Sequence, residues 1–172
     1  GGVPGNRTTM VITPIIAAAG LKIPKTSSRS ITSPAGTADT MEVLADIGSS
    51  IKKMKTVIDK TNGCIIWGGA LNLAPADDKI IRVERPLAID AESQLIASIM
   101  AKKHSVSSTH ILIDIPTGAG SKMPSHQEAL KLKEKFEQIG TALKKHIKVI
   151  ITDGSQPVGN GIGPALEARD VL

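Results

Sequence analysis

Aromatic residues are almost absent from this chain of 172 residues, which contains one tryptophan, one phenylalanine and no tyrosine. A nucleic-acid surface that stacks bases on aromatic rings therefore has almost nothing to work with, and we expect no nucleic-acid partner. The core must instead be built from aliphatic side chains and methionine. Hydrophobic residues make up 41% of the chain and charged residues 22%, a balance that excludes a disordered or collagen-like protein.

Cysteine and long apolar runs are also scarce. The single cysteine, Cys64, excludes an internal disulfide and is compatible with the cytosol. The longest apolar run, residues 10–21, contains Pro14, is too short to span a bilayer and lacks the flanks of a signal peptide. The net charge of +5 is a mild excess, which fits solvated helix faces or a positive field that attracts a small anion. We expect a cytoplasmic protein without a membrane partner.

Short apolar segments alternate with helical patterns along the chain. Strands are expected at residues 21–26, 64–67, 111–115 and 147–151, and helices at 8–19, 37–45, 50–62, 91–103 and 161–172. A further long helix should turn an apolar stripe inward, formed by Leu130, Leu132, Phe136, Ile139 and Leu143. This order predicts a single α/β domain over residues 1–172, with a mostly parallel sheet covered by helices on both faces.

Ligands of such sheets bind outside the carboxyl ends of the strands. Residues 25–37 run from the end of the first expected strand to a helix start, with seven hydroxyl side chains, a glycine and two cations, Lys25 and Arg29. Hydroxyls and backbone N–H groups satisfy an oxyanion directly, and Arg29 is suited to a bidentate contact. The segment therefore predicts a phosphate site, with an ordinary capping loop as the alternative.

Other familiar signatures are incomplete. Glycine-rich segments at residues 118–120 and 159–163 lack the spacing of a dinucleotide fingerprint, and a triphosphate-binding glycine-lysine pattern is missing. The glycine-rich turn at residues 1–6 precedes a helix and could approach a phosphate closely, but by itself it is a weak signal. The four histidines show no metal-ligand spacing, so we expect no metal. Asp90, just before an expected helix, is most simply its N-cap.

Long ordered motifs make the chain recognisable. Residues 25–44 read KTSSRSITSPAGTADTMEVL, residues 67–78 read WGGALNLAPADD, residues 82–87 read RVERPL, residues 97–103 read ASIMAKK, and residues 156–159 read QPVG. Together they closely resemble the thymidine phosphorylase family, and within it the branch that contains AMP phosphorylases. The resemblance covers practically the whole chain.

The resemblance implies a pentosyltransferase. In this family inorganic phosphate, as co-substrate, cleaves the N-glycosidic bond of a nucleoside or nucleotide to a free base and a pentose 1-phosphate, without a cofactor. The chain is similar to most of the family's α/β catalytic domain, the nucleoside phosphorylase/phosphoribosyltransferase fold. The family's helical domain and a preceding phosphate-site segment are missing, so we expect a fragment of a longer homo-oligomeric enzyme, inactive by itself.

The resemblance also assigns residues. Thr9, Ser27 and Thr37 match phosphate contacts of pyrimidine phosphorylases, and Asp90 matches the proton donor of the AMP branch. The AMP-branch match marks Gly2, Thr37, Ser98, Lys122 and the run Ser28, Arg29, Ser30, Ile31, Thr32 and Ser33 as nucleotide-contacting. Some relatives hold a monovalent cation at positions matching Val158, Gly161 and Asp170, but the chain differs at Gly5-Asn6-Arg7, so no ion is predicted.

Substrate preference stays open between two readings. Pyrimidine enzymes carry a serine and a lysine four residues apart, which Ser98 and Lys102 preserve, but Arg82 and Arg85 compete for the accompanying arginine. Because Ile31-Thr32-Ser33 replaces a histidine-containing run, AMP is favoured over thymidine. An anthranilate phosphoribosyltransferase-like, magnesium-dependent reaction is a further alternative, from the resemblance of residues 36–44, and a non-catalytic nucleotide-binding domain is the last.

Overall fold

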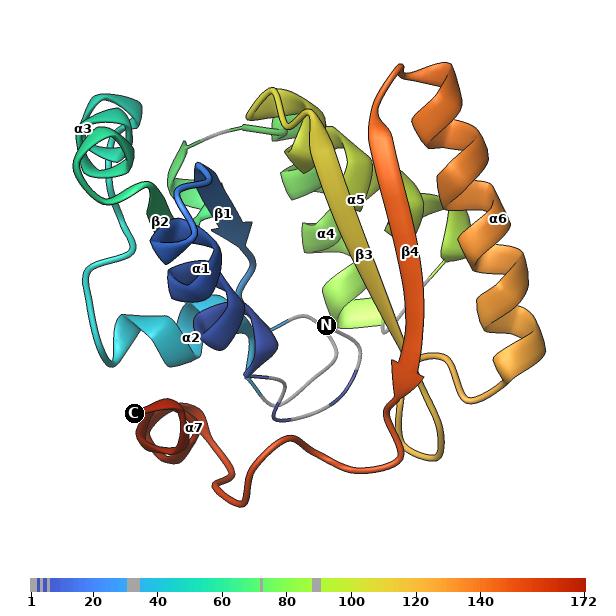
Figure 1. Ribbon diagram of the computed structural model, residues 1–172. Helices are drawn as coiled ribbons and strands as arrows, with labels where there is room; N and C mark the ends of the chain where they lie inside the picture. Colours follow the sequence, from blue (N-terminus) through green and yellow to red (C-terminus); the bar gives the residue numbers. More distant parts are fainter. Residues whose placement is uncertain (1–2, 4, 6, 31–34, 72, 88–90) are drawn as a thin grey trace.

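The structure is a computed structural model that describes residues 3, 5, 7–30, 35–71, 73–87 and 91–172 (Figure 1). Its helices and strands follow one another as α1 (Thr8–Ala18), β1 (Ile23–Ser27), α2 (Thr37–Glu42), α3 (Ile51–Thr61), β2 (Gly63–Trp67), α4 (Pro75–Leu87), α5 (Glu92–Ser105), β3 (His110–Thr117), α6 (His126–Ala142), β4 (His146–Asp153) and α7 (Pro164–Val171). A short 3₁₀ helix, η1 (Gly68–Leu71), follows β2.

All paired strands run parallel, which confirms the predicted α/β class. β1 pairs with β2 from Ile23 opposite Gly63 to Ser27 opposite Trp67. β3 pairs with β4 from His110 opposite His146 to Thr117 opposite Asp153. In the described part of the chain these are two separate two-stranded sheets, each with its own helices (Figure 1).

The main core belongs to the β3–β4 sheet. Ile111, Ile113 and Ile115 alternate along β3 and are buried, as the two-residue period of a strand requires. They pack with buried residues of α5 and α6, among them Phe136, which is 1% exposed. The other face of β3 carries Leu112, which is 57% exposed.

The buried stripe of α6 is partly different from the predicted one. Leu132 and Phe136 are buried and Ile139 packs against the same cluster, as expected. The prediction for Leu130 and Leu143 is wrong, because they are 44% and 40% exposed. Ala129 and Gly140 are buried in their place, since they lie three and four residues from Leu132 and Phe136 on the same helical face.

Helix α4 was not predicted from the sequence. It carries ordinary start signals, with Pro75 at its first position and Asp77 and Asp78 in its first turn. The other expected elements are confirmed with shifts of a few residues. The last helix begins at Pro164 rather than at residue 161, because Pro164 sits at the start of α7 behind Gly163, whose φ is +95°.

A segment that we call the strap, residues 154–163, connects the carboxyl end of β4 to α7 on the side of the first sheet (Figure 1). It leaves the end of β4 and leads to α7, which packs against α2. Thr40 of α2, fully buried, lies 3.3 Å from a carboxylate oxygen of Glu167 on α7. The strap therefore runs past the strand ends where the sequence predicts the ligand site.

Candidate phosphate and nucleotide site

A carboxylate holds the two ends of the segment after β1 together. Asp39, in the first turn of α2, accepts hydrogen bonds from the backbone N–H groups of Ser30 and Gly36, both at 2.9 Å. The carbonyl of Ser28 accepts from the N–H of Ala38 at 3.2 Å. A Cβ at Gly36 would lie 2.6 Å from the Ser28 carbonyl oxygen, so only glycine fits. The two ends of the loop are thus held together beside Ser27.

The side chain of Arg29 contacts residues of α2 and β2. Its guanidinium forms bonds of 2.7 and 2.8 Å with Glu42 and of 3.0 Å with Asp39, and it lies over the ring of Trp67 at 4.8 Å. The hydrogen bonds that its guanidinium donates to Glu42 and Asp39 raise the pKa of Arg29. Burial alone would raise the pKa of Asp39, but the N–H groups of Gly36 and Ser30 and the Arg29 guanidinium lower it overall. Arg29 is thereby tied to α2.

The other proposed phosphate residues lie around this loop. Ser27 is buried at the end of β1, and its hydroxyl donates to the carbonyl of Ile66 at 3.4 Å. Thr37 begins α2 and Thr9 lies in the first turn of α1, both half-buried. Gly2, Ile31, Thr32, Ser33 and Asp90 lie outside the described residues.

The sequence gives Asp90 two alternative roles, the N-cap of the following helix and, by resemblance, a proton donor. The N-cap of α5 is Ala91, which has an extended backbone and forms no side-chain cap hydrogen bond. Helix α5 therefore begins one residue later than the N-cap prediction for Asp90 requires, and Asp90 itself lies outside the described residues.

A buried carboxylate joins the predicted serine–lysine pair. Ser98 donates to Asp77 at 2.9 Å, Lys102 forms an ion pair with Asp77 at 2.9 Å, and Lys102 also donates to Ser98 at 3.0 Å. Asp77 is 5% exposed and accepts a further bond from Gln94. Sequence reasoning missed Asp77, because helix α4, which carries it, was not predicted.

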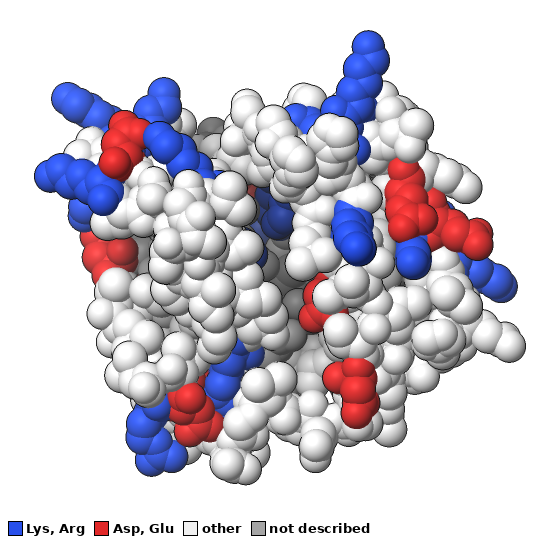
Figure 2. Space-filling view, viewed as in Figure 1, with Lys and Arg blue, Asp and Glu red and all other residues white. Residues whose placement is uncertain are grey.

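Two further lysines share the electrostatic surroundings of Lys102. Burial and the charges of Lys103 and Lys102 lower the pKa of Lys25 to about 7. Burial and the charge of Lys102 lower the pKa of Lys103 to about 8. Figure 2 shows a hollow between the two halves of the molecule with basic side chains in its walls. The mutual repulsion of these three lysines would be relieved by an anion, so the region is favourable for one.

Lys122 lies at the carboxyl edge of the second sheet. It is exposed in the turn after β3, where Gly118 has a φ of +136° and a Cβ would meet the backbone of Ser155 at 2.8 Å. The N–H of Gly154 donates to the carbonyl of Thr117. The turn is thus packed against the strap, and this packing fixes the position of the Lys122 backbone at the edge of the sheet.

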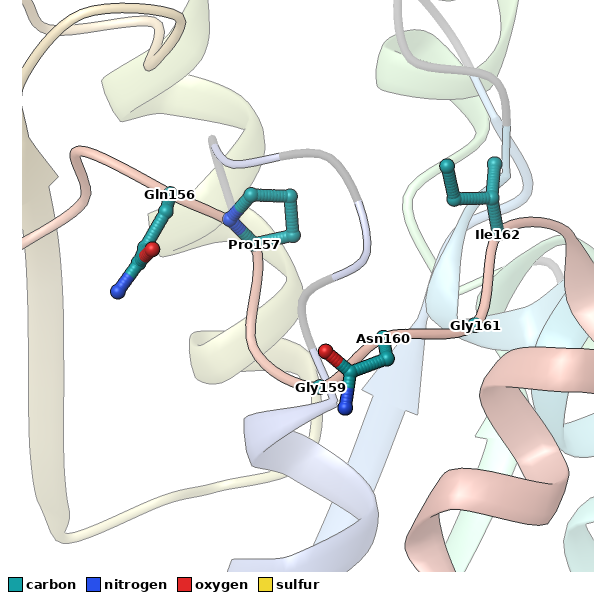
Figure 3. A pocket seen from close by; sticks show the side chains of 6 residues that line it. All are labelled: Gln156, Pro157, Gly159, Asn160, Gly161 and Ile162. Atoms are coloured by element: carbon teal, nitrogen blue, oxygen red, sulfur yellow. The ribbon is translucent and has the colours of Figure 1, made fainter.

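The strap also holds Arg7, immediately before α1. The Arg7 guanidinium donates to the carbonyls of Gly5, Val158 and Gly161, and lies 3.1 Å from an Asp170 oxygen. A pocket of about 470 Å³ beside it is lined by Gln156, Pro157, Gly159, Asn160, Gly161 and Ile162 (Figure 3). The strap passes close to the start of α1 in this view.

The described residues contain no group of three histidine, cysteine, aspartate or glutamate side chains arranged to hold a metal ion. Within the same part of the chain, every helix is too short or too polar to cross a membrane.

Comparison with known proteins gives consistent matches. The family model described as "Glycosyl transferase family, a/b domain" matches residues 1–111. Over all 172 residues the chain is 58% identical to a protein of Bradyrhizobium diazoefficiens and to one of Legionella pneumophila strain Corby, both named "Putative thymidine phosphorylase". It is 56% identical to "Putative thymidine phosphorylase 2" of Acidovorax sp.. The chain spans about a third of the length of these relatives.

Proposed function

We propose that this chain, which belongs to the glycosyl transferase family, forms the phosphate- and nucleotide-binding part of a pentosyltransferase. The reaction is phosphorolysis: inorganic phosphate attacks C1′ of a pentose, the bond from C1′ to the base breaks, and free base and pentose 1-phosphate form. The intact enzyme is a cytoplasmic homo-oligomer in this proposal. The match of the whole chain to the thymidine phosphorylase relatives supports this reaction class.

The observation that carries the proposal is the hydrogen-bonded junction between the end of β1 and the start of α2. Asp39 holds the N–H groups of Ser30 and Gly36, so the backbone around Ser27 is fixed before a ligand arrives. A backbone held in place before binding loses little entropy when it binds an anion, and hydroxyl and amide donors on it stabilise charge that moves during the reaction. Ser27, Thr37 and Thr9 are the proposed phosphate donors.

The leaving base needs a proton, and Asp90 is the proposed acid. A carboxylic acid that protonates a purine must have a pKa above its usual value of about 4, which burial in a closed site supplies. The N-cap position of α5 belongs to Ala91, which is consistent with a role for Asp90 other than capping.

We favour a nucleoside 5′-monophosphate, with AMP first, over thymidine. Lys102 and Ser98, the pair that pyrimidine enzymes present to the ring, are both bound to the buried Asp77 here. A lysine that already neutralises a buried carboxylate has less to offer an uncharged pyrimidine. The additional amines of Lys25 and Lys103 favour a substrate that carries a phosphate of its own.

The test is phosphate-dependent base release by the intact protein with AMP, CMP, UMP, thymidine and uridine, with and without magnesium. We expect AMP to be turned over fastest, without a need for magnesium. Preference for thymidine would transfer the base-binding role to Ser98 and Lys102. Strict magnesium dependence with a phosphoribosyl diphosphate donor would instead identify a phosphoribosyltransferase.

Asp90→Asn separates the proposed acid from the binding residues. The amide keeps the size of the side chain but has no proton to give, so kcat for AMP should fall about 100-fold or more while KM changes little. Asp78→Asn, on α4, is the matched control and should keep wild-type kinetics. Turnover of AMP at the wild-type rate by Asp90→Asn would refute the assignment.

A further inference from the structure

Two lysine side chains from different halves of the molecule lie close together. Lys25 is in β1, in the first sheet, and Lys103 is near the end of α5, which packs on the second sheet. The charges that bear most on Lys25 are those of Lys103 and its neighbour Lys102. The two amines therefore meet in space, although α2, α3, β2 and α4 separate them along the chain.

The charges of this cluster are only partly balanced. Lys102 forms an ion pair with the buried Asp77 at 2.9 Å, so its charge has a counter-ion. In the described part of the chain neither Lys25 nor Lys103 forms an ion pair, and burial lowers the pKa of both side chains. When all three amines hold a proton, three positive charges meet one negative charge, and two positive charges are left without a partner.

Lys25 lies beside the proposed phosphate loop without belonging to it. It is on the same side of β1 as Ser27, because side chains two residues apart in a strand share a face. The two positions are about 7 Å apart along the strand, which leaves room for one pentose between an anion at each. The Lys25 ammonium donates to the carbonyl of Thr26 at 2.8 Å, so two of its three hydrogens remain for a ligand.

We propose that Lys25 and Lys103 form a second anion site, separate from the loop after β1, which takes a doubly charged phosphate group between β1 and α5. A phosphomonoester has a second pKa of about 6 and carries about two negative charges above it, which matches the unbalanced charge of the cluster. The 5′-phosphate of a nucleotide substrate is the occupant if the proposed function holds. Inorganic phosphate is the other source of the same chemistry.

The elements packed against β1 determine which groups respond to such an anion. Helix α1 has no titratable side chain, and every charged residue of α3 is exposed. On β2 the Cys64 thiol accepts a hydrogen bond from the Lys25 backbone, and burial raises the pKa of this thiol. On α5 the charged groups are Lys103 and Lys102, the latter paired with Asp77. An anion here is therefore expected to change the protonation of lysine amines.

The test is calorimetric titration of the intact protein at pH 8 with ribose 5-phosphate and, separately, with inorganic phosphate. Lys25→Met and Lys103→Met should each raise the Kd of at least one of these ligands about tenfold or more, because each removes a buried charge that faces the anion. A loss confined to ribose 5-phosphate supports the site and identifies the substrate's own phosphate as its occupant. A loss confined to inorganic phosphate supports the site and identifies the free ion.

Lys55→Met, at an exposed position of α3, is the matched control, because it removes the same net charge from the surface. Its Kd values should stay within about twofold of wild type, since surface charges are screened by salt. Loss of the Lys25 charge relieves repulsion in the fold, so weaker binding by Lys25→Met is not explained by unfolding. Unchanged Kd values for both ligands in both variants, Lys25→Met and Lys103→Met, would overturn the proposal.

Proton uptake separates this site from the loop after β1. The pKa of Lys25 is about 7 and that of Lys103 about 8, so at pH 8 both amines are partly neutral and a bound anion makes them take up protons. Hydroxyl and N–H donors bind an anion without this change. Titration in two buffers with different heats of ionisation measures the uptake, which should fall to about half or less in Lys25→Met. Absence of uptake by the wild type would contradict the proposal.

The second anion site and the proposed function fail separately. If the intact protein binds ribose 5-phosphate with proton uptake but releases no base from any nucleotide, the function fails and the site stands. If the protein releases adenine from AMP, but Lys25→Met and Lys103→Met leave the Kd values and the KM for AMP unchanged, the site fails and the function stands.

Discussion

Lys25 is the residue whose environment is most unfavourable for its charge. It lies in β1, its ammonium donates to the carbonyl of Thr26, and burial and two neighbouring lysines lower its pKa from 10.5 to about 7. Between these two pH values the unfolded chain holds a proton that the folded chain releases. The free energy of unfolding therefore rises as pH increases from about 7 to about 10.5, and the penalty for burying the charge is complete below pH 7.

Replacement of Lys25 by methionine should therefore stabilise the fold in a pH-dependent way. We expect Lys25→Met to raise the free energy of unfolding by about 2 kcal/mol at low pH, with the gain vanishing towards high pH. Chemical denaturation of the intact protein across this range measures the difference. Lys55→Met, at an exposed position of α3, is the control. A gain that grows with pH would contradict the proposed environment of Lys25.

Residues whose partners are distant in sequence were the least predictable ones. The loop after β1 was identified from its hydroxyls, but the pairing of Arg29 with Glu42 and Asp39 was not. The sequence does not show which partners an arginine side chain contacts in the folded protein. Asp77 was missed because helix α4, which carries it, was not predicted. Arg7 and Asp170 are 163 residues apart, and only the folded chain brings them together.

Elements were easier to predict, because hydrophobic period is a local property. β3, β4 and α6 combine long periodic patterns with buried faces, and they were found within a few residues. α4 was missed because its polar first turn and Pro86 resemble a loop. The separation of the strands into two pairs depends on tertiary contacts, and no local pattern encodes it.

Gly140 gives a test at the level of the element. In an exposed helix a glycine-to-alanine change gains about 1 kcal/mol of helix propensity. Here the new Cβ would lie 2.7 Å from Ile147 of β4, so we expect Gly140→Ala to lower the free energy of unfolding by about 1–3 kcal/mol instead. Denaturant titration measures the change, with Gln138→Ala on the exposed side of α6 as control. A stabilised Gly140→Ala would show that α6 packs elsewhere.

At the scale of the whole molecule the two sheets differ in protection. β3 and β4 pair over eight residues each around the main buried cluster, whereas β1 and β2 pair over five and are half-buried for most of their length. We expect the amide hydrogens of β3 and β4 to exchange at least tenfold more slowly than those of β1 and β2, measured by mass spectrometry on the intact protein. Equal rates would mean that both sheets open in a single cooperative step.

The contact between α2 and α7 has a consequence for biosynthesis. Thr40 and Glu167 are 127 residues apart, so the buried face of α2 must wait for nearly all of this chain to leave the ribosome before its partner exists. At the usual pace of translation, about 5–20 residues per second, that interval lasts roughly ten seconds. During that time Ala38 and Thr40, both fully covered in the finished fold, are exposed to chaperones and to neighbouring nascent chains.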